Sequence, residues 1–306
     1  MIRVTRDNVC YAMSSANRPV LEVSQHETFC VETKDCYSDA LRSPEDRFTK
    51  AMWNTVNPAT GPVYFPGAEP GRPLRIEILD IRTRPYAVMC LEQGSGALGG
   101  FIEASETTIL PIENNLLMLN GALSIPIRPM IGVIGTAPAG TPVLNGTPGE
   151  HGGNMDCKLI TAGSVLYLPV NTKGALLALG DLHAVMGDGE VCLCGAEVSG
   201  EVTLRAAQVD SLIPTPCVET ESHFHFIGSA ETLDECERMV LEKAHRFLTR
   251  VEKLSSNEAA RAMSLLGDLG VCQVVDPLKT MRFSVPKTLL NRPVYRSGRP
   301  ESGNGA

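Results

Sequence analysis

The chain has 306 residues, of which 43% are hydrophobic and 20% are charged, a balance typical of a globular protein. A formal net charge of -8 leaves no basic face for nucleic acid or for an anionic membrane. No apolar run reaches the roughly 20 residues of a membrane-spanning helix, and the first residues carry no secretory signal. We therefore expect a cytoplasmic protein whose ten cysteines are mostly reduced and buried.

The first two thirds of the chain alternate apolar and polar residues in short runs, which is typical of half-buried strands. The clearest run covers residues 74–81. Further short strands are expected at residues 19–33, 86–91, 125–134, 164–169, 175–179, 190–193 and 197–205. Apart from the strand at 86–91, residues 36–54 and 83–124 are less regular and predict small helices or long loops. Many short strands separated by turns favour a β-sandwich or barrel.

The pattern changes after about residue 217, where helical periodicity begins. Thr232 and Glu235 have the spacing of a capping box, and the apolar residues behind them keep a helical period to about Leu254. Around this helix we expect a strand at 222–227, a second helix at 258–266, a strand at 271–275 and a final element near 283–290.

Two domains and a tail follow from this change of pattern. The β-rich domain is expected over residues 1–216 and a smaller α+β lobe over residues 217–295. Residues 296–306 consist mainly of glycine, serine, proline and charged residues, and are expected to be a disordered tail.

Acidic and imidazole side chains gather among glycines near the end of the β-rich part. Asp181 and His183 are separated by one residue, so both side chains leave the same face of an extended strand. Asp188 and Glu190 repeat this spacing, although Asp188-Gly189 is also a common hairpin turn. We therefore regard Asp188 as a turn residue and keep the other three as candidates.

A second group comes from the preceding loop. His151 and Asp156 can join the cluster, because Gly152 and Gly153 allow the backbone to bend sharply between them. Carboxylate oxygens and imidazole nitrogens are the ligands of divalent metals, with zinc as the example that takes both. The residues thus predict a metal site or an acid–base site.

Other patterns predict structure instead of chemistry. Residues 94–99 match a dinucleotide-binding glycine motif, but no helical pattern follows them, so we expect a plain loop. His223 and His225 share a face of the expected strand and are assigned to packing in the smaller lobe.

Several segments, in order along the chain, resemble the acetamidase/formamidase family. They are residues 57–64, 67–71, 151–156 (His-Gly-Gly-Asn-Met-Asp), 180–183 and 187–190, with further support from 31–35, 264–269 and 275–276. The resemblance runs from about residue 18 to about residue 290 and is closest to acetamidase-like members. The chain departs from the family pattern at Arg72, Leu182 and Met186, and residues 36–54 are unfamiliar.

The resemblance implies hydrolysis of short aliphatic amides, such as acetamide and formamide, to the acid and ammonia. It also implies a jelly-roll-like β-sandwich core, a homo-oligomer of two or more chains, and a zinc or calcium ion as the divalent metal. Residues matching the family motifs are the metal ligands His151, Asp156, Asp181 and His183, the catalytic residues Glu190, Asp181 and Asn154, and the substrate-binding residues Asp35 and Glu69.

We take Glu190 as the carboxylate that moves a proton from water to the leaving nitrogen, because an amide nitrogen leaves poorly as an anion. Two alternatives stay open. One is a metal-independent amidase with Cys157 as the nucleophile. The other is a non-catalytic β-sandwich protein with a structural calcium site, although calcium prefers oxygen ligands without imidazole. Residues 36–54 directly follow Asp35 and are placed to alter substrate choice.

Overall fold

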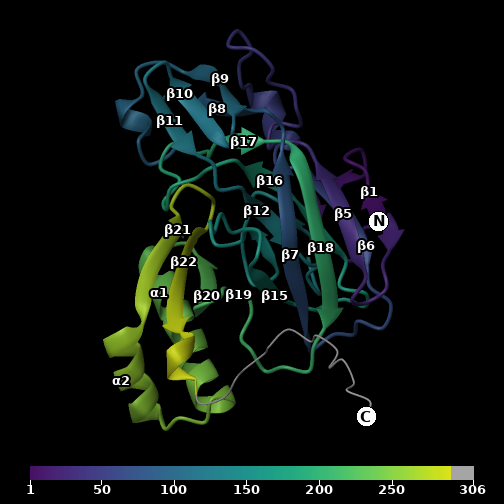
Figure 1. Ribbon diagram of the computed structural model, residues 1–306, viewed down its shortest axis with the longest axis vertical. Coiled ribbons are helices and arrows are strands. Elements are labelled where there is room, and N and C mark those ends of the chain that lie inside the picture. The colour runs from purple at the N-terminus through teal and green to yellow at the C-terminus, as the bar shows by residue number, and fades with distance from the viewer. Residues whose placement is uncertain (291–306) are drawn as a thin grey trace, which may run out of the picture.

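The computed structural model describes residues 1–290, which form two large β-sheets packed against each other, with helices at one end (Figure 1). Within this range the first sheet has nine strands, antiparallel except for the first pair. Their spatial order is β1 (Ile2–Val4), β5 (Thr28–Thr33), β18 (Gly200–Gln208), β7 (Pro73–Thr83), β15 (Val165–Pro169), β19 (Cys217–Glu219), β20 (His223–Ala230), β22 (Lys279–Pro286) and β21 (Asp268–Gln273).

The second sheet has eleven strands across the described residues. Its main path is β11 (Leu123–Pro126), β10 (Leu116–Asn120), β9 (Glu106–Glu113), β8 (Tyr86–Leu91), β17 (Glu197–Val198), β16 (Leu177–His183), β12 (Met130–Gly135) and β14 (Gly152–Asn154). Off this path, β6 (Ala59–Tyr64) pairs with β16, β2 (Val9–Cys10) and β4 (Leu21–Glu22). A small ribbon joins β3 (Ala12–Met13) to β13 (Val143–Leu144).

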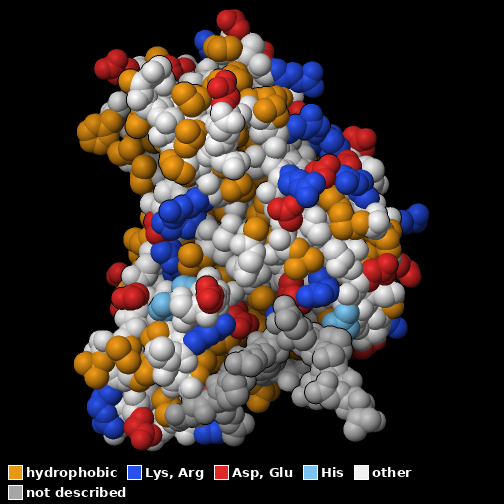
Figure 2. Space-filling view, viewed as in Figure 1, with side chains coloured by type: hydrophobic (Ala, Val, Ile, Leu, Met, Phe, Trp, Pro, Cys, Tyr) orange, Lys and Arg blue, Asp and Glu red, His pale blue; other side chains and the backbone are white. Residues whose placement is uncertain are grey.

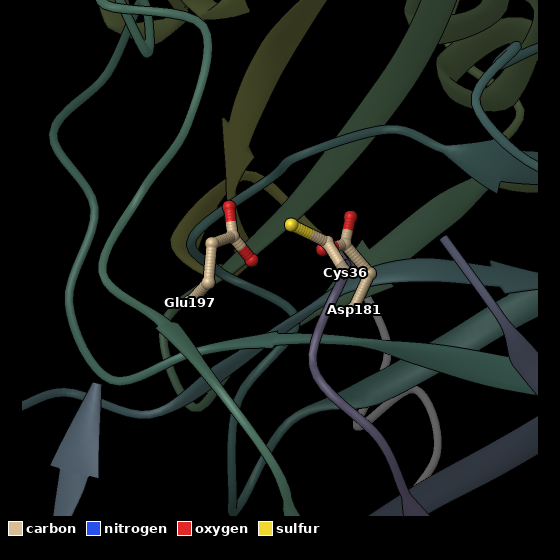
Figure 3. A group of neighbouring side chains, drawn as sticks. All are labelled: Cys36, Asp181 and Glu197. Carbon is tan, nitrogen blue, oxygen red and sulfur yellow. The ribbon is translucent and has the colours of Figure 1, made fainter. Parts of the chain in front are cut away.

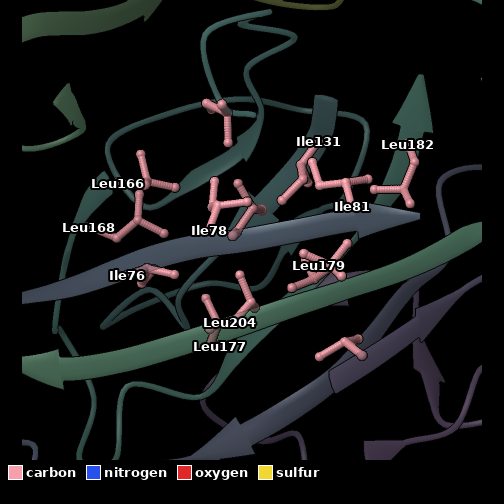
Figure 4. Close-up of a cluster of buried hydrophobic side chains, with 14 of the residues drawn as sticks. Ile76, Ile78, Ile81, Ile131, Leu166, Leu168, Leu177, Leu179, Leu182 and Leu204 are labelled. Carbon is pink, nitrogen blue, oxygen red and sulfur yellow. The ribbon is translucent and has the colours of Figure 1, made fainter. Parts of the chain in front are cut away.

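The main hydrophobic core lies between the two sheets (Figure 4). Strand β7 shows how the sequence places it. Ile76 and Ile78 point inward and are at most 1% exposed, and Leu179 of β16 belongs to the same cluster. Arg75 and Glu77 alternate with them and form an ion pair at 2.6 Å on the other face. Burying one such aliphatic side chain stabilises the fold by about 1.5–3 kcal/mol.

The C-terminal part has its own apolar cluster. Helix α1 (Leu233–Arg246) packs on β20 and β22, a π-turn η3 (Phe247–Val251) extends it, and α2 (Ser256–Leu266) follows. Phe247 lies against Phe224 and Phe226, with ring centroids 5.2 and 5.1 Å apart. The expected packing role of His225 agrees with its position, because its Nδ1 lies 2.8 Å from the Ser284 hydroxyl. Short 3-10 turns are η1 (Lys50–Asn54), η2 (Gly99–Phe101) and η4 (Lys287–Leu289).

The two parts share one sheet. Strand β15 pairs with β19, and Val165 lies opposite Glu219. The nine-stranded sheet therefore continues across residue 217. The expected boundary between residues 1–216 and 217–295 therefore lies within one sheet, and residues from both sides of it contribute to each hydrophobic cluster. The division into domains stays a prediction.

Most of the sequence-based expectations for the fold are confirmed. The fold is mainly β with a smaller C-terminal α+β part. The strands expected at 74–81, 86–91 and 164–169 appear as β7, β8 and β15, and residues 36–54 contain only a loop and η1. The capping box is present, because the Thr232 hydroxyl accepts a hydrogen bond from the backbone nitrogen of Glu235 at 3.2 Å.

The expectation of helices or loops over residues 83–124 is wrong beyond β8. This region forms the antiparallel strands β8 to β11. The sequence pattern did not predict these strands because large apolar side chains also lie on their exposed face, so apolar and polar residues do not alternate. Leu119 and Leu123, for example, are 40% and 48% exposed. Figure 2 shows hydrophobic side chains gathered over this part of the surface.

The strand expected at residues 190–193 is also wrong. Glu190 and Leu193 have φ angles of 48° and 79°, in the left-handed region that interrupts an extended strand. The segment is a loop. The expected tail at residues 296–306 lies outside the described residues. Among residues 1–290, no helix combines the length and the apolar character needed to cross a membrane.

Replacing Thr232 by alanine is expected to reduce the free energy of unfolding by about 0.5–2 kcal/mol, because the first turn of α1 loses its cap. Urea unfolding followed by circular dichroism measures the change. Thr232→Ser keeps the hydroxyl and should remain near the parent value. Glu231→Gln, at the exposed neighbouring position, should also remain near it. A Thr232→Ala protein as stable as the parent would contradict the role of the cap.

Candidate functional site

A cavity of about 590 Å³ lies where the second sheet meets the loops that follow β5, β13 and β21. At its closed end are Asp181, Glu190 and Glu197, which are 2%, 7% and 2% exposed. Its open part is lined by apolar side chains, including Phe48 and Trp53, together with polar ones such as Asn54. Acids thus concentrate at the buried end of the cavity.

Strand β16 carries the centre of the site. Asp181 and His183 both lie on it, and His183 Nε2 is 3.5 Å from Asp181 Oδ1. The same-face prediction for this pair is confirmed. Strand β17 pairs with β16 so that Glu197 lies opposite His183, and Glu197 Oε1 is 3.3 Å from His183 Nε2. The sequence analysis missed Glu197, whose role follows from strand pairing.

Two further carboxylates complete a ring around the imidazole. Asp156 Oδ1 and Glu190 Oε1 each lie 3.8 Å from His183 Nε2. His183 is 1% exposed. Burial by itself lowers the pKa of His183, but Glu197 and Asp181 together raise that pKa well above its ordinary value. In the metal-free chain the imidazole is therefore held as the cation.

One imidazolium does not satisfy all of these acids. Burial raises the pKa of Glu197 to about 8 and the pKa of Asp156 to about 6. The pKa of Glu190 is raised well above its usual range, first by burial and then by Asp156. Buried atoms without a hydrogen-bond partner are Asp156 Oδ1 and Oδ2, Asp181 Oδ1, Glu197 Oε2 and both ring nitrogens of His183. Buried carboxylates of this kind require protons or a cation.

The residues fit a metal ion. Two groups have ligand atoms that all lie within 4.8 Å of one another: Asp156 with His183 and Glu190, and Cys36 with Asp181 and Glu197. In Figure 3 the second group converges, with Cys36 entering from the N-terminal half of the chain. A Cβ atom on Gly132 would lie 2.5 Å from Asp156 Oδ1 and 2.8 Å from Asp181 Oδ2, so only glycine leaves this space open.

The backbone around the acids is strained. Asp156, Asp181 and Glu190 have φ angles of 40°, 54° and 48°. A side chain other than glycine in this region costs about 1–3 kcal/mol, and such residues cluster at functional sites. The fold tolerates the cost in three acids of one site, which supports a function that needs their orientation.

Asn154 and Asp276 form the side of the cavity nearest the C-terminal lobe. Asn154 Nδ2 donates a hydrogen bond to Asp276 Oδ2 at 3.0 Å, and both residues line the cavity. Asp276 lies in the turn between β21 and β22. The sequence did not single out Asp276 as a site residue. It contributed only as part of the segment 275–276, which supports the family resemblance.

The remaining site predictions lie away from the acids or beside them. Asp35 is 3% exposed and accepts hydrogen bonds from the backbone nitrogens of Tyr37 and Asp39 at 3.0 and 2.7 Å, so it shapes the start of the loop. His151 is buried beside β14, outside both groups of ligand atoms. Glu69 lies on an exposed loop, 3.8 Å from Lys173 and outside the cavity lining. The roles of these residues stay predictions.

Two other residues considered from the sequence, Asp188 and Cys157, lie in contacts that stabilise the fold and do not face the cavity. Asp188 turns away from the site and binds Arg282 and Lys158 at 2.8 and 2.9 Å, as its turn assignment suggested. Cys157 is fully buried in the main hydrophobic core and does not line the cavity.

Comparisons with known proteins find similar sequences and similar structures. The acetamidase/formamidase family profile matches residues 143–224, which contain most of the acids. The chain is 46% identical in sequence to acetamidase from Bacillus halodurans, whose crystal structure is known. The match covers 94% of this chain and 98% of that one, with a TM-score of 0.92. It is 40% identical to a protein from Thermoanaerobacter tengcongensis described as a predicted acetamidase/formamidase, covering 94% and 96% of the two chains with a TM-score of 0.91.

Curated relatives match over shorter stretches. The formamidase of Methylophilus methylotrophus is 44% identical over 63 residues, which are 20% of this chain and 16% of that protein. The chain aligns with 60% or less of the length of the curated relatives. The solved structures match almost from end to end, and on that basis the chain belongs to the acetamidase/formamidase family.

Proposed function

We propose that this protein hydrolyses the carbon–nitrogen bond of primary amides, giving a carboxylic acid and ammonia. The observation that carries the proposal is the ring of four carboxylates around His183, three of which, Asp181, Glu190 and Glu197, line the closed end of a cavity. Its relative in Bacillus halodurans, named an acetamidase, supports the same reaction. Amide hydrolysis requires activation of water and protonation of a poor leaving group, and positioned carboxyl groups supply both.

A divalent metal is part of the proposal. Three of the metal ligands expected from the sequence lie together in the structure: Asp156, Asp181 and His183. Glu197 lies beside His183 and is added to them as a proposed ligand. Their unpartnered oxygens and the space above Gly132 fit a cation. Zinc accepts both imidazole and carboxylate, whereas calcium takes six to eight oxygens, so zinc suits this donor set better. Such an ion polarises a carbonyl oxygen and lowers the pKa of water.

Glu190 is the proposed base. Its carboxylate lines the cavity, so a water molecule and an amide carbon can both reach it. A nearby cation would lower its pKa and keep it ionised. Glu190 then accepts the proton of the attacking water and donates it to the leaving nitrogen as the bond to carbon breaks. Asn154 has a second N–H besides the one given to Asp276, and it can donate that hydrogen to the amide oxygen.

The alternatives have weaker support. Cys157 lies in the core, where no amide would reach it. Cys36 does line the cavity, but burial raises its pKa well above the ordinary value, which disfavours a reactive thiolate. A purely structural calcium site is disfavoured because His183 faces the acids.

A homo-oligomer of two or more chains stays part of the proposal. Its support is the exposed apolar surface over β8 to β11 in Figure 2, where Leu123 is 48% exposed and Phe101 of the neighbouring η2 is 84% exposed. Surfaces of this kind are covered in many oligomers.

Glu190→Gln is expected to reduce kcat for short amides by about 10²–10⁴-fold, because the substitution removes the proton acceptor. Ammonia release from acetamide, formamide and propionamide measures this, with and without a chelator. Asp188→Asn is the matched control: it lies in the same loop but faces Arg282, and kcat should change by less than about threefold. Near-normal turnover by Glu190→Gln would exclude its role as the base. Full activity after verified metal removal would exclude the metal.

Gly132→Ala is expected to weaken zinc binding at least about tenfold, because the new Cβ displaces the carboxylates of Asp156 and Asp181. Metal content after dialysis against competing chelator measures the effect, and far-UV circular dichroism checks the fold. Gly121→Ala is the control, since a Cβ there meets no atom within 4 Å. Equal zinc affinity in both variants would contradict the proposed ligand geometry.

Metal-free protein is expected to lose stability as the pH rises from 6.5 to 8. The raised pKa values of Glu197, at about 8, and Asp35, at about 7, mean that the folded chain keeps protons that the unfolded chain has already lost. The pKa of His183 is also raised, so the stabilisation that its protonated ring provides likewise decreases as the pH rises above the ordinary histidine pKa. His151 and His225 have pKa values lowered to about 4 and 3, so most of their opposite contribution is already present at pH 6.5.

Urea unfolding at several pH values in the presence of a chelator tests this dependence. Added zinc should stabilise the protein more at pH 8 than at pH 6.5, because the cation replaces the missing protons. Stability that rises with pH in the metal-free protein would show that these acids are not buried together.

A further inference from the structure

The cavity is much larger than the smallest amides. It encloses about 590 Å³. Since a water molecule takes about 30 Å³ of liquid, acetamide with its four heavy atoms takes on the order of 100 Å³. Cavities of about 300–1,000 Å³ are typical of sites for much larger ligands. Acetamide would leave most of this space to water.

The cavity has an acidic end and an apolar wall. Its closed end holds Asp181, Glu190 and Glu197. Elsewhere its lining includes the apolar side chains of Phe48 and Trp53 beside several polar ones, and Trp53 is 53% exposed. A side chain that lines a cavity and remains half exposed has free surface that a ligand can cover. The division therefore suits a ligand with one polar end and one apolar end.

The apolar wall belongs to a closed loop, residues 36–57. The backbone nitrogen of Asn57 donates to the carbonyl oxygen of Cys36 at 2.8 Å, which joins the two ends of the loop. Inside it, Tyr37 contacts Phe48 with ring centroids 5.9 Å apart, and Phe48 contacts Trp53 at 4.9 Å, both edge to face. The loop thus presents a chain of three packed aromatic rings to the cavity.

The acidic closed end determines the orientation in which an amide binds. Carboxylates accept hydrogen bonds, so they can receive both hydrogens of an amide –NH₂ group, and they repel a negatively charged acyl chain. The Asn154 amide can donate to the carbonyl oxygen at the same end. The acyl substituent is left to face Phe48 and Trp53.

From this arrangement we propose that the preferred substrates are uncharged primary amides whose acyl group carries an apolar group of about the size of a phenyl ring. The inference rests on the proposed function and names the substrate class of the same site. In the reaction, the oxygen of water bonds to the carbonyl carbon, the carbon–nitrogen bond breaks, and the nitrogen leaves as ammonia with the proton from water. The aromatic wall holds the acyl group throughout.

Steady-state ammonia release tests the preference. The value of kcat/KM for 2-phenylacetamide should exceed that for acetamide at least about tenfold, because the ring is buried against the apolar wall. Trp53→Ala and Leu144→Ala, both at exposed positions that line the cavity, should reduce this ratio at least about threefold. Leu212→Ala, whose side chain is 77% exposed and outside the cavity lining, is the control and should preserve the ratio.

A binding measurement separates this inference from the proposed reaction. Trp53 is the single tryptophan of the chain, so its fluorescence reports directly on the cavity wall. Titration of the Glu190→Gln protein with 2-phenylacetamide should change the emission and saturate at a concentration at least about tenfold lower than with acetamide. Saturation by 2-phenylacetamide without hydrolysis of any amide would support the binding inference and overturn the proposed function. Acetamide hydrolysis with equal or better kcat/KM, and no preferential binding, would support the function and overturn the inference.

Discussion

His183 is enclosed by four carboxylates beside the closed end of the cavity, and the folded chain has to offset their mutual repulsion. The protonated imidazole offsets part of it in the metal-free chain. The remaining acids keep raised pKa values or unpartnered oxygens. Because burial penalises an uncompensated carboxylate so strongly, the site is stable only with extra protons or with a cation. The expected pH dependence, the proposed metal and the proposed base all depend on this one electrostatic constraint.

Glycine and left-handed backbone make the close approach of these groups sterically feasible. A Cβ on Gly195 would lie 2.8 Å from Cγ of His183, and one on Gly132 would enter the space between two carboxylates. Asp156, Asp181 and Glu190 adopt positive φ angles, which turn their carboxylates toward the imidazole. At Asp181 this strain is sustained because β16 and its neighbour β12 are buried on all sides and cannot relax without opening the core. Strands therefore hold Asp181 and Glu197, whereas Asp156 and Glu190 lie in loops beside them.

Three parts of the chain meet at the cavity. The paired strands β16 and β17 supply Asp181 and Glu197, residues 36–57 supply the aromatic wall, and the turn after β21 supplies Asp276, which accepts the hydrogen bond of Asn154 at 3.0 Å. The C-terminal lobe is thus a component of the site. The continuation of the nine-stranded sheet from β15 into β19 fixes the lobe relative to the sandwich, and with it the position of that turn.

The sequence by itself determined the features that depend on neighbouring residues. Alternation predicted the β-rich core, the spacing of Thr232 and Glu235 predicted the helix cap, and parity on one strand predicted that Asp181 and His183 would meet. Ordered family segments identified the family. Tertiary structure alone brought Glu197 beside His183 and Asp276 beside Asn154, and left Glu69 and His151 outside the cluster. The reason is physical: periodicity records which face a residue occupies, whereas convergence depends on strand register and on turns that bring distant segments together.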